Sequence, residues 1–217
     1  KQKKQNKDLI GFCGGPFTVF NYMIEQGTSK THEKLKKFIK NNDQISDKII
    51  RIITEISIEY LKKQIDSGVD FIKVFDSWAG LLHGDLYKKY IIEPNKQIAK
   101  EIKNYSPRTK QIFFPRGSKV NYFNFIKEVK PDVISLDEEF PEKVFSYAKK
   151  NDIILQGNLK PTTLIEGGRK LKKGIKNILK KFKENKHIFN LSHGVLPQTP
   201  VENVEILVDT IRHYNET

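Results

Sequence analysis

The chain has 217 residues, 30% of them charged, with a single cysteine and a formal net charge of +13. This length and composition exclude a disordered or fibrous protein, an internal disulfide, a site with two cysteine ligands and, because no apolar run approaches roughly 18 residues, a transmembrane protein. Only five of the 39 basic residues are arginine, so we expect a solvated, lysine-rich surface rather than a nucleic-acid interface.

Six short apolar runs follow one another along the chain, each rich in Ile, Val, Leu or Phe without polar alternation. Such runs are typical of strands that are buried on both faces of a parallel sheet. We predict strands at Leu9–Cys13, Phe71–Phe75, Gln111–Phe114, Val133–Leu136, Ile153–Leu155 and His187–Leu191. The segment before the first strand, Lys1 to Asp8, lacks the apolar stretch of a secretory signal, so we expect a soluble, cytoplasmic protein.

Segments with helical spacing of apolar residues lie between the runs. In one of them Ile49, Ile53 and Ile56 fall near one face, and Gly68 follows as a stop signal. We predict helices at Ile45–Ser67, Leu86–Lys103, Thr163–Lys183 and Val201–Tyr214. Strand followed by helix, repeated, indicates right-handed βαβ units.

The predicted fold class is α/β, a partial (β/α)8 TIM barrel with about six of its eight strands present. No linker or low-complexity segment divides the chain, so residues 1–217 are expected to form a single incomplete barrel domain. The chain begins at Lys1, and its first strand starts within about ten residues of that end. Because a closed barrel needs eight strands and about 250 residues, either the sheet is open or an N-terminal piece is missing.

Polar residues gather directly after the predicted strands, where parallel barrels keep their active sites. They are Cys13, Gly14 and Gly15; Asp76, Ser77 and Trp78; Arg116 and Gly117; Asp137; Gln156, Gly157 and Asn158; and Ser192, His193 and Gly194. Each group also has a structural interpretation. Gly14 and Gly15 fit a tight turn, Asp76 and Asp137 fit caps of the following helices, and His193 fits a bond to a neighbouring backbone.

Four motifs follow one another in order along the chain. The first is Gly11-Phe12-Cys13-Gly14-Gly15-Pro16-Phe17-Thr18, followed by Asn21-Tyr22-Met23-Ile24-Glu25. The others are Phe75-Asp76-Ser77-Trp78-Ala79-Gly80, Leu155-Gln156-Gly157-Asn158-Leu159 and Phe189-Asn190-Leu191-Ser192-His193-Gly194-Val195-Leu196-Pro197. These motifs resemble, in the same order, segments of uroporphyrinogen decarboxylase, and the match runs over essentially the whole chain.

The resemblance implies a (β/α)8 barrel, usually a homodimer, that removes carbon dioxide from the four acetate side chains of uroporphyrinogen III to give coproporphyrinogen III in haem biosynthesis. It implies no cofactor and no metal. By motif position, Tyr22, Ser77 and His193 correspond to residues that contact the substrate. Arg116 is an additional candidate partner for a substrate carboxylate.

The chain departs from the family pattern at several positions. The family's Arg-Gln-Ala-Gly-Arg segment and its central aspartate, which contacts the pyrrole nitrogens, have no match here, so the catalytic residue is unknown. Lys160 stands where the family usually has aspartate, and Ser192 replaces a glycine. We therefore expect this chain to be the C-terminal portion of a uroporphyrinogen decarboxylase, with little or no activity by itself.

Two alternatives remain open. One is a basic, non-catalytic module that binds anionic tetrapyrroles or nucleic acid. The other is a corrinoid-linked methyltransferase, a relative of the decarboxylase that uses thiolate and histidine zinc ligands. Cys13 alone cannot supply that ligand set.

Overall fold

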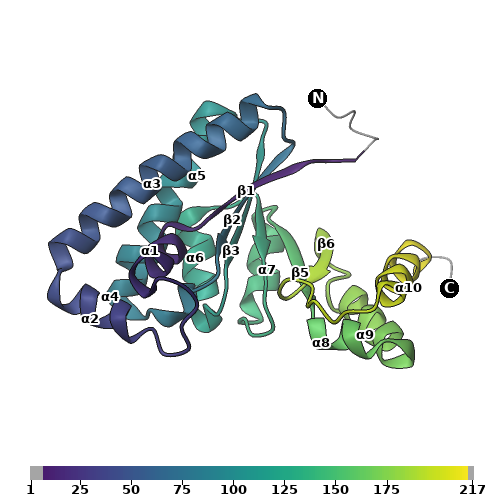
Figure 1. The fold of residues 1–217 in the computed structure, drawn as a ribbon. Coiled ribbons are helices and arrows are strands. Elements are labelled where there is room, and N and C mark those ends of the chain that lie inside the picture. Colours follow the sequence, from purple (N-terminus) through teal and green to yellow (C-terminus); the bar gives the residue numbers. More distant parts are fainter. Residues whose placement is uncertain (1–6, 215–217) are drawn as a thin grey trace. The chain divides into compact units, whose positions relative to one another are not determined.

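The computed structural model describes residues 7–214, in which six strands alternate with helices (Figure 1). The predicted α/β class, a partial (β/α)8 barrel, is confirmed by this order of elements. The chain divides between Asp132 and Val133 into two compact units. Each unit is described separately.

The first unit contains three parallel strands, in the order β1, β2, β3. They are β1 (Ile10–Gly14), β2 (Phe71–Asp76) and β3 (Lys110–Pro115). Gly14 pairs with Phe75, and Asp76 pairs with Pro115, so the carboxyl ends of the strands lie side by side. Residues that close these strands can therefore meet at one edge of the sheet.

The helices of the first unit include a long pair. Helices α3 (Asp43–Asp66) and α5 (Glu93–Tyr105) pack against each other (Figure 1). The remaining elements are α1 (Pro16–Glu25), α2 (Glu33–Asn41), a 3-10 turn (Ala79–Leu81), α4 (Gly84–Tyr87), a π-helical turn (Lys88–Ile92), a 3-10 turn (Lys119–Asn121) and α6 (Tyr122–Val129). The predicted helix Leu86–Lys103 thus contains a π turn, which comes just before Pro94, a residue without a backbone N–H.

The second unit contains the other three strands, again parallel and in chain order. They are β4 (Val133–Ser135), β5 (Ile154–Leu159) and β6 (His187–Leu191), with helices α7 (Lys143–Lys150), α8 (Pro161–Glu166), α9 (Gly168–Lys181) and α10 (Val201–Arg212). Leu159, Leu164, Leu171 and Ile175 form its core, against which Ile206, Leu207 and Ile211 of α10 pack.

Two sequence-based boundaries in the second unit are wrong. The predicted helix Thr163–Lys183 is two helices, because Gly167 adopts a positive φ of 66° and the Asn203 side chain donates to the carbonyls of Leu164 and Ile165. Strand β5 extends to Leu159 rather than ending at Leu155. Gln156, Gly157 and Asn158 are therefore part of the strand and do not follow it.

Candidate functional site

The carboxylate of Asp76, the last residue of β2, lies at the centre of the strand ends in the first unit. It is 1% exposed. Its Oδ1 accepts hydrogen bonds from the Thr18 backbone N–H (3.2 Å) and the Thr18 hydroxyl (2.7 Å). Its Oδ2 accepts a bond from Asn95 Nδ2 (3.1 Å). Asp76 therefore caps α1, which precedes it, and the prediction that it caps the following helix is wrong.

The Thr18 hydroxyl connects this carboxylate to the turn after β2. Besides donating to Asp76, Thr18 Oγ1 accepts a hydrogen bond from the Trp78 backbone N–H at 3.2 Å. Thr18 lies in the first turn of α1, which carries Tyr22, and Trp78 directly follows Ser77. One buried carboxylate thus holds both elements that carry the predicted contact residues of this unit.

Gly15 is small because Asp76 occupies the space that a side chain would need. A Cβ placed on Gly15 would lie 2.5 Å from the Asp76 carboxyl carbon. The Gly15 φ is −63°, a value open to any residue. The glycine pair was predicted to permit a tight turn, but at Gly15 the requirement is close approach.

The amide of Asn95 is positioned by the turn that precedes α5. Asn95 Nδ2 donates to the Ile91 carbonyl at 2.8 Å as well as to Asp76. Its Oδ1 is buried without a hydrogen-bond partner among the described residues. Ile91 belongs to the π-helical turn at Lys88–Ile92, so this turn supplies the carbonyl that orients the Asn95 amide.

Burial changes the protonation of two groups here. It raises the pKa of Asp76 to about 6, although the hydrogen bonds from Thr18 and Asn95 oppose that shift. Burial, together with the nearby Asp76 charge, raises the pKa of the Cys13 thiol to about 12. Cys13 is therefore a protonated thiol at neutral pH, a poor nucleophile and a poor zinc ligand.

Tyr22 and Ser77 are brought to the same region through Trp78. The Tyr22 ring packs edge-on against Trp78 with ring centroids 6.4 Å apart. Tyr22 is exposed, Ser77 is half-buried, and neither hydroxyl has a hydrogen bond within residues 7–214. Both hydroxyls are thus available to an incoming ligand.

His32 packs against Trp78 as well and was not predicted from the sequence. Its ring lies 4.5 Å from the Trp78 ring, and its Nδ1 is 2.8 Å from Asn21 Oδ1. Asn21 Nδ2 and Trp78 Nε1 are buried donors that lack an acceptor in the described part of the chain. No sequence motif marks His32, because the contact depends on how the loop after α1 folds back.

Arg116 follows β3 as predicted. Its backbone N–H donates to the Asp76 carbonyl (3.1 Å), and its carbonyl accepts from the Gly80 N–H (2.9 Å). The guanidinium forms no ion pair or side-chain hydrogen bond with any residue that the structure describes. An unpaired guanidinium beside the strand ends suits a carboxylate ligand.

Lys73, within β2, is a second residue that sequence reasoning missed. It is buried, and its ammonium lies 4.7 Å from the Phe75 ring centroid and 5.6 Å from that of Phe114. Burial lowers its pKa to about 8. A lysine inside an otherwise apolar run was the available signal.

In the second unit, polar strand residues are held by neighbouring strands and by the backbone. Asn158 Nδ2 donates to the Asp137 carbonyl at 2.6 Å, and the Ser135 hydroxyl donates a hydrogen bond to Gln156. Asp137 Oδ1 accepts from the Glu139 N–H at 3.2 Å. Asp137 therefore starts a local turn, and the predicted cap of the following helix α7 (Lys143–Lys150) is not formed by this bond.

His193 lies in the loop after β6 and is exposed. The Gly194 backbone N–H donates to its Nδ1 at 2.6 Å. The proton of a neutral His193 imidazole therefore sits on Nε2. The neighbouring Ser192 is buried, and its hydroxyl is 3.5 Å from Glu138 Oε1.

Lys160, which stands at a position where the resemblance implies aspartate, is neutralised locally. Its ammonium lies 2.8 Å from Glu138 Oε2, and both side chains are substantially exposed. The extra positive charge is thus offset within the second unit.

The part of the chain that the structure describes contains neither a cluster of metal ligands nor a membrane-spanning helix. Within residues 7–214, no three His, Cys, Asp or Glu side chains come together as metal ligands would. No helix in that range is long and apolar enough to cross a membrane.

Comparison with known proteins finds relatives over nearly the whole chain. A family model described as Uroporphyrinogen decarboxylase (URO-D) matches residues 1–214. The chain is 42% identical over 215 residues to the uroporphyrinogen decarboxylase of Rickettsia bellii (strain RML369-C), covering 99% of this chain and 63% of that protein. It is 40% identical over 217 residues to the enzyme of Rickettsia massiliae (strain Mtu5), covering 100% of this chain and 62% of that protein. The chain thus spans about three fifths of the length of these relatives.

Among solved structures, a methyltransferase from Methanosarcina mazei is similar to the chain with a TM-score of 0.73 and 20% sequence identity. The similarity covers 96% of this chain and 59% of that protein. At this identity the likeness concerns the fold alone.

Proposed function

We propose a function for this chain, which belongs to the uroporphyrinogen decarboxylase family. It takes part in removing carbon dioxide from the acetate side chains of uroporphyrinogen III. Its share in that reaction is to bind the carboxylates of the substrate. The observation that carries the proposal is the set of unsatisfied polar groups beside the strand ends of the first unit, namely the Tyr22 and Ser77 hydroxyls and the Arg116 guanidinium.

Each group has the chemistry that a carboxylated substrate needs. The Tyr22 and Ser77 hydroxyls can each donate one hydrogen bond to a carboxylate, and Arg116 can donate two in a fork. His193 of the second unit, with its Nε2 protonated, is proposed as a further donor. Asp76 is a positioning residue in this proposal, because its carboxylate is occupied by Thr18 and Asn95.

The reaction itself explains why donors matter. A proton adds to the pyrrole ring carbon next to the one that bears the acetate, and the ring becomes cationic. The bond between the methylene carbon and the carboxylate then breaks, its electrons pass into the ring, and carbon dioxide leaves. A second proton adds to the exposed methylene to give a methyl group, and the first proton leaves the ring carbon, which restores the aromatic pyrrole. Fixing the other carboxylates holds the reacting ring in one orientation.

Residues 1–217 contain no match for the arginine pair and the aspartate that the family resemblance places at the substrate. We therefore expect these residues by themselves to bind tetrapyrrole without decarboxylating it. Incubation of the purified chain with uroporphyrinogen, followed by chromatography of the oxidised products, checks this expectation. Coproporphyrin among the products would contradict it.

Binding can be tested with uroporphyrin and coproporphyrin, in which methyl groups replace the acetates. A titration followed by porphyrin fluorescence measures both affinities. The chain should bind uroporphyrin more tightly than coproporphyrin. Tyr22→Phe, Ser77→Ala and His193→Asn should each weaken it about tenfold, the value of one charge-assisted hydrogen bond. Tyr60→Phe, on the exposed face of α3, is the matched control and should have no effect.

Two results would reject the proposed binding role. One is unchanged affinity in all three variants. The other is equally tight binding of duplex DNA with a steep loss of affinity at higher salt, which would indicate a general basic binding module instead.

A further inference from the structure

A cavity lies at the other end of β3 from the strand-end cluster, in the first unit. It has a volume of about 520 Å³ and opens between α5, α6 and the start of β3. Lys96, Ala99, Lys100 and Lys103 recur along one face of α5, so their side chains line one wall. A volume of this size suits a small ligand.

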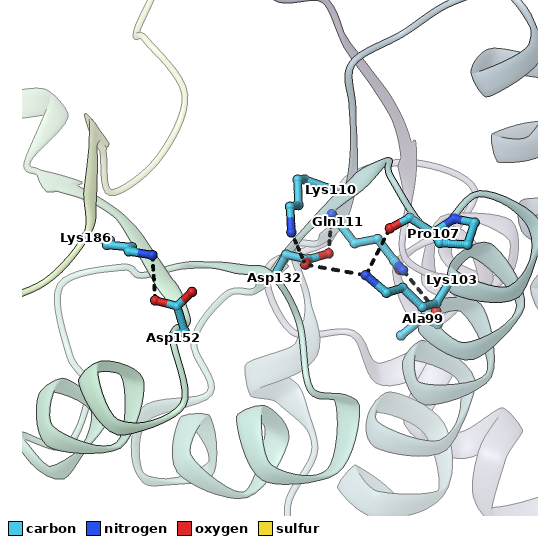
Figure 2. A network of polar contacts seen from close by, with 8 residues as sticks. All are labelled: Ala99, Lys103, Pro107, Lys110, Gln111, Asp132, Asp152 and Lys186. Atoms are coloured by element: carbon cyan, nitrogen blue, oxygen red, sulfur yellow. Dashed lines mark hydrogen bonds and ion pairs between the residues drawn. The ribbon is translucent and has the colours of Figure 1, made fainter.

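One residue that lines this cavity has a buried polar atom without a partner among the described residues. Gln111 is 3% exposed, and its Nε2 donates to the Ala99 carbonyl at 3.0 Å. Its Oε1 has no donor among the described residues. Figure 2 shows Gln111 fixed from both sides, because its backbone N–H also donates to Asp132 Oδ2 at 3.1 Å. A buried acceptor held in this way favours a ligand that brings a hydroxyl or N–H donor.

The cavity carries an excess of positive charge. Five lysines line it, Lys96, Lys100, Lys103, Lys127 and Lys130, against two carboxylates. Asp132 is already engaged by Lys110 (3.0 Å) and Lys103 (3.9 Å), as Figure 2 shows. Glu128 pairs with Lys96 at 3.1 Å.

Three lysines are left over. Within residues 7–214, Lys100, Lys127 and Lys130 form no ion pair. Lys100 belongs to α5, Lys127 to α6, and Lys130 directly follows α6, and all three line the cavity. Several unpaired ammonium groups around one cavity are suited to a phosphate, whose oxygens accept from several donors at once.

We propose that this cavity binds a small phosphorylated sugar. Lys100, Lys127 and Lys130 hold the phosphate, and Gln111 Oε1 accepts a hydrogen bond from a sugar hydroxyl. The site is separate from the strand-end cluster, because Gln111 lies near the start of β3 and Arg116 just after its end, about 16 Å away along the strand.

Calorimetric titration of the whole chain with ribose 5-phosphate, inorganic phosphate and ribose tests the proposal. Ribose 5-phosphate should bind saturably at one site per chain, inorganic phosphate about tenfold more weakly, and ribose not at all. Lys100→Gln and Lys127→Gln should each weaken binding of ribose 5-phosphate about tenfold. Lys172→Gln, which changes an exposed lysine of α9, is the control and should have no effect.

Gln111→Met separates the two parts of the proposed site. It should abolish the preference for ribose 5-phosphate over inorganic phosphate and leave phosphate affinity unchanged. Absence of saturable binding, or an equal loss in Lys172→Gln, would overturn the proposal. Lys100→Gln should leave the affinity for uroporphyrin unaltered, and Tyr22→Phe should leave the affinity for ribose 5-phosphate unaltered. Failure of this proposal can therefore be distinguished from failure of the proposed substrate site.

Discussion

In the first unit, the carboxylate of Asp76 at the end of β2 is fully buried and accepts three hydrogen bonds, whereas Asp137, which follows β4 in the second unit, is half-buried and starts a local turn. Both aspartates follow the same pattern in the sequence, an apolar run ending in a carboxylate. Their environments differ because α1 and α5 supply donors to Asp76. The position of an aspartate at the end of a strand therefore does not determine its structural role. That role depends on the residues that pack around its side chain.

The largest expected effect is on stability, through Asp76. Asp76→Ala would leave the Thr18 and Asn95 donors buried without an acceptor, and should lower the free energy of unfolding of the first unit by about 3 to 5 kcal/mol. Urea unfolding followed by the fluorescence of Trp78, the only tryptophan, measures it. Asp137→Ala removes a half-buried carboxylate and should destabilise the second unit less, as measured by hydrogen exchange. Similar losses from both substitutions would remove the contrast between the units.

The two units should also respond oppositely to pH. The pKa of Asp76 is raised from 3.8 to about 6, so its contribution to stability is complete below about pH 4 and is lost as pH rises through 6, by up to about 3 kcal/mol. Burial beside Phe182 lowers the pKa of His187, so its contribution is present above 6.5 and is lost as pH falls.

Unfolding measured by Trp78 fluorescence, and exchange of the β5 and β6 amides, would follow the two units between pH 4 and 7. Asp76→Asn is the control, because it removes the titrating group and should flatten the slope of the first unit alone. A slope of the same sign in both units would contradict the assignment.

A smaller effect should come from Gly15. Gly15→Ala forces a methyl group toward the Asp76 carboxyl carbon and should cost about 1 to 3 kcal/mol. Gly194, at the strand end of the second unit, has open space beside it, because a Cβ added there would meet no atom within 4 Å. Gly194→Ala should change stability by no more than about 0.5 kcal/mol. Thermal unfolding of both variants compares the two strand ends directly.

The smallest effect should come from Lys160. Its ion pair with Glu138 is largely exposed, so Lys160→Gln should leave the stability of the second unit nearly unchanged. Hydrogen exchange in the presence and absence of about 0.5 M salt checks this, since salt should abolish the difference. A loss of stability as large as that of Gly15→Ala would mean that the second unit also depends on a strand-end charge.

Much of the fold could be predicted from the sequence. All six apolar runs became strands, and His187–Leu191 has the predicted bounds. The broken helix at Gly167 could not be predicted, because the break depends on Asn203, a residue of α10. The length of β5 was missed for a related reason, since buried polar residues such as Asn158 are stabilised by partners on other elements.

The candidate site was predicted less completely. The prediction that Tyr22 and Ser77 contact the substrate rests on motif resemblance. In the structure, neither hydroxyl has a hydrogen-bond partner among the described residues. His32 and Lys73 were missed, since their surroundings come from a loop and from neighbouring strands. Whether Tyr22, Ser77 and His193 contact substrate stays a prediction for the binding experiments.

The sequence by itself determined the strand positions and the family, because burial in a parallel sheet and the ordered motifs are both written in short local segments. Only the tertiary structure decided what the polar residues do. Thr18 and Asp76 are 58 residues apart, and Asn95 comes a further 19 residues along. A carboxylate's pKa and partners depend on such distant neighbours, because both the loss of water and the arrival of donors result from packing.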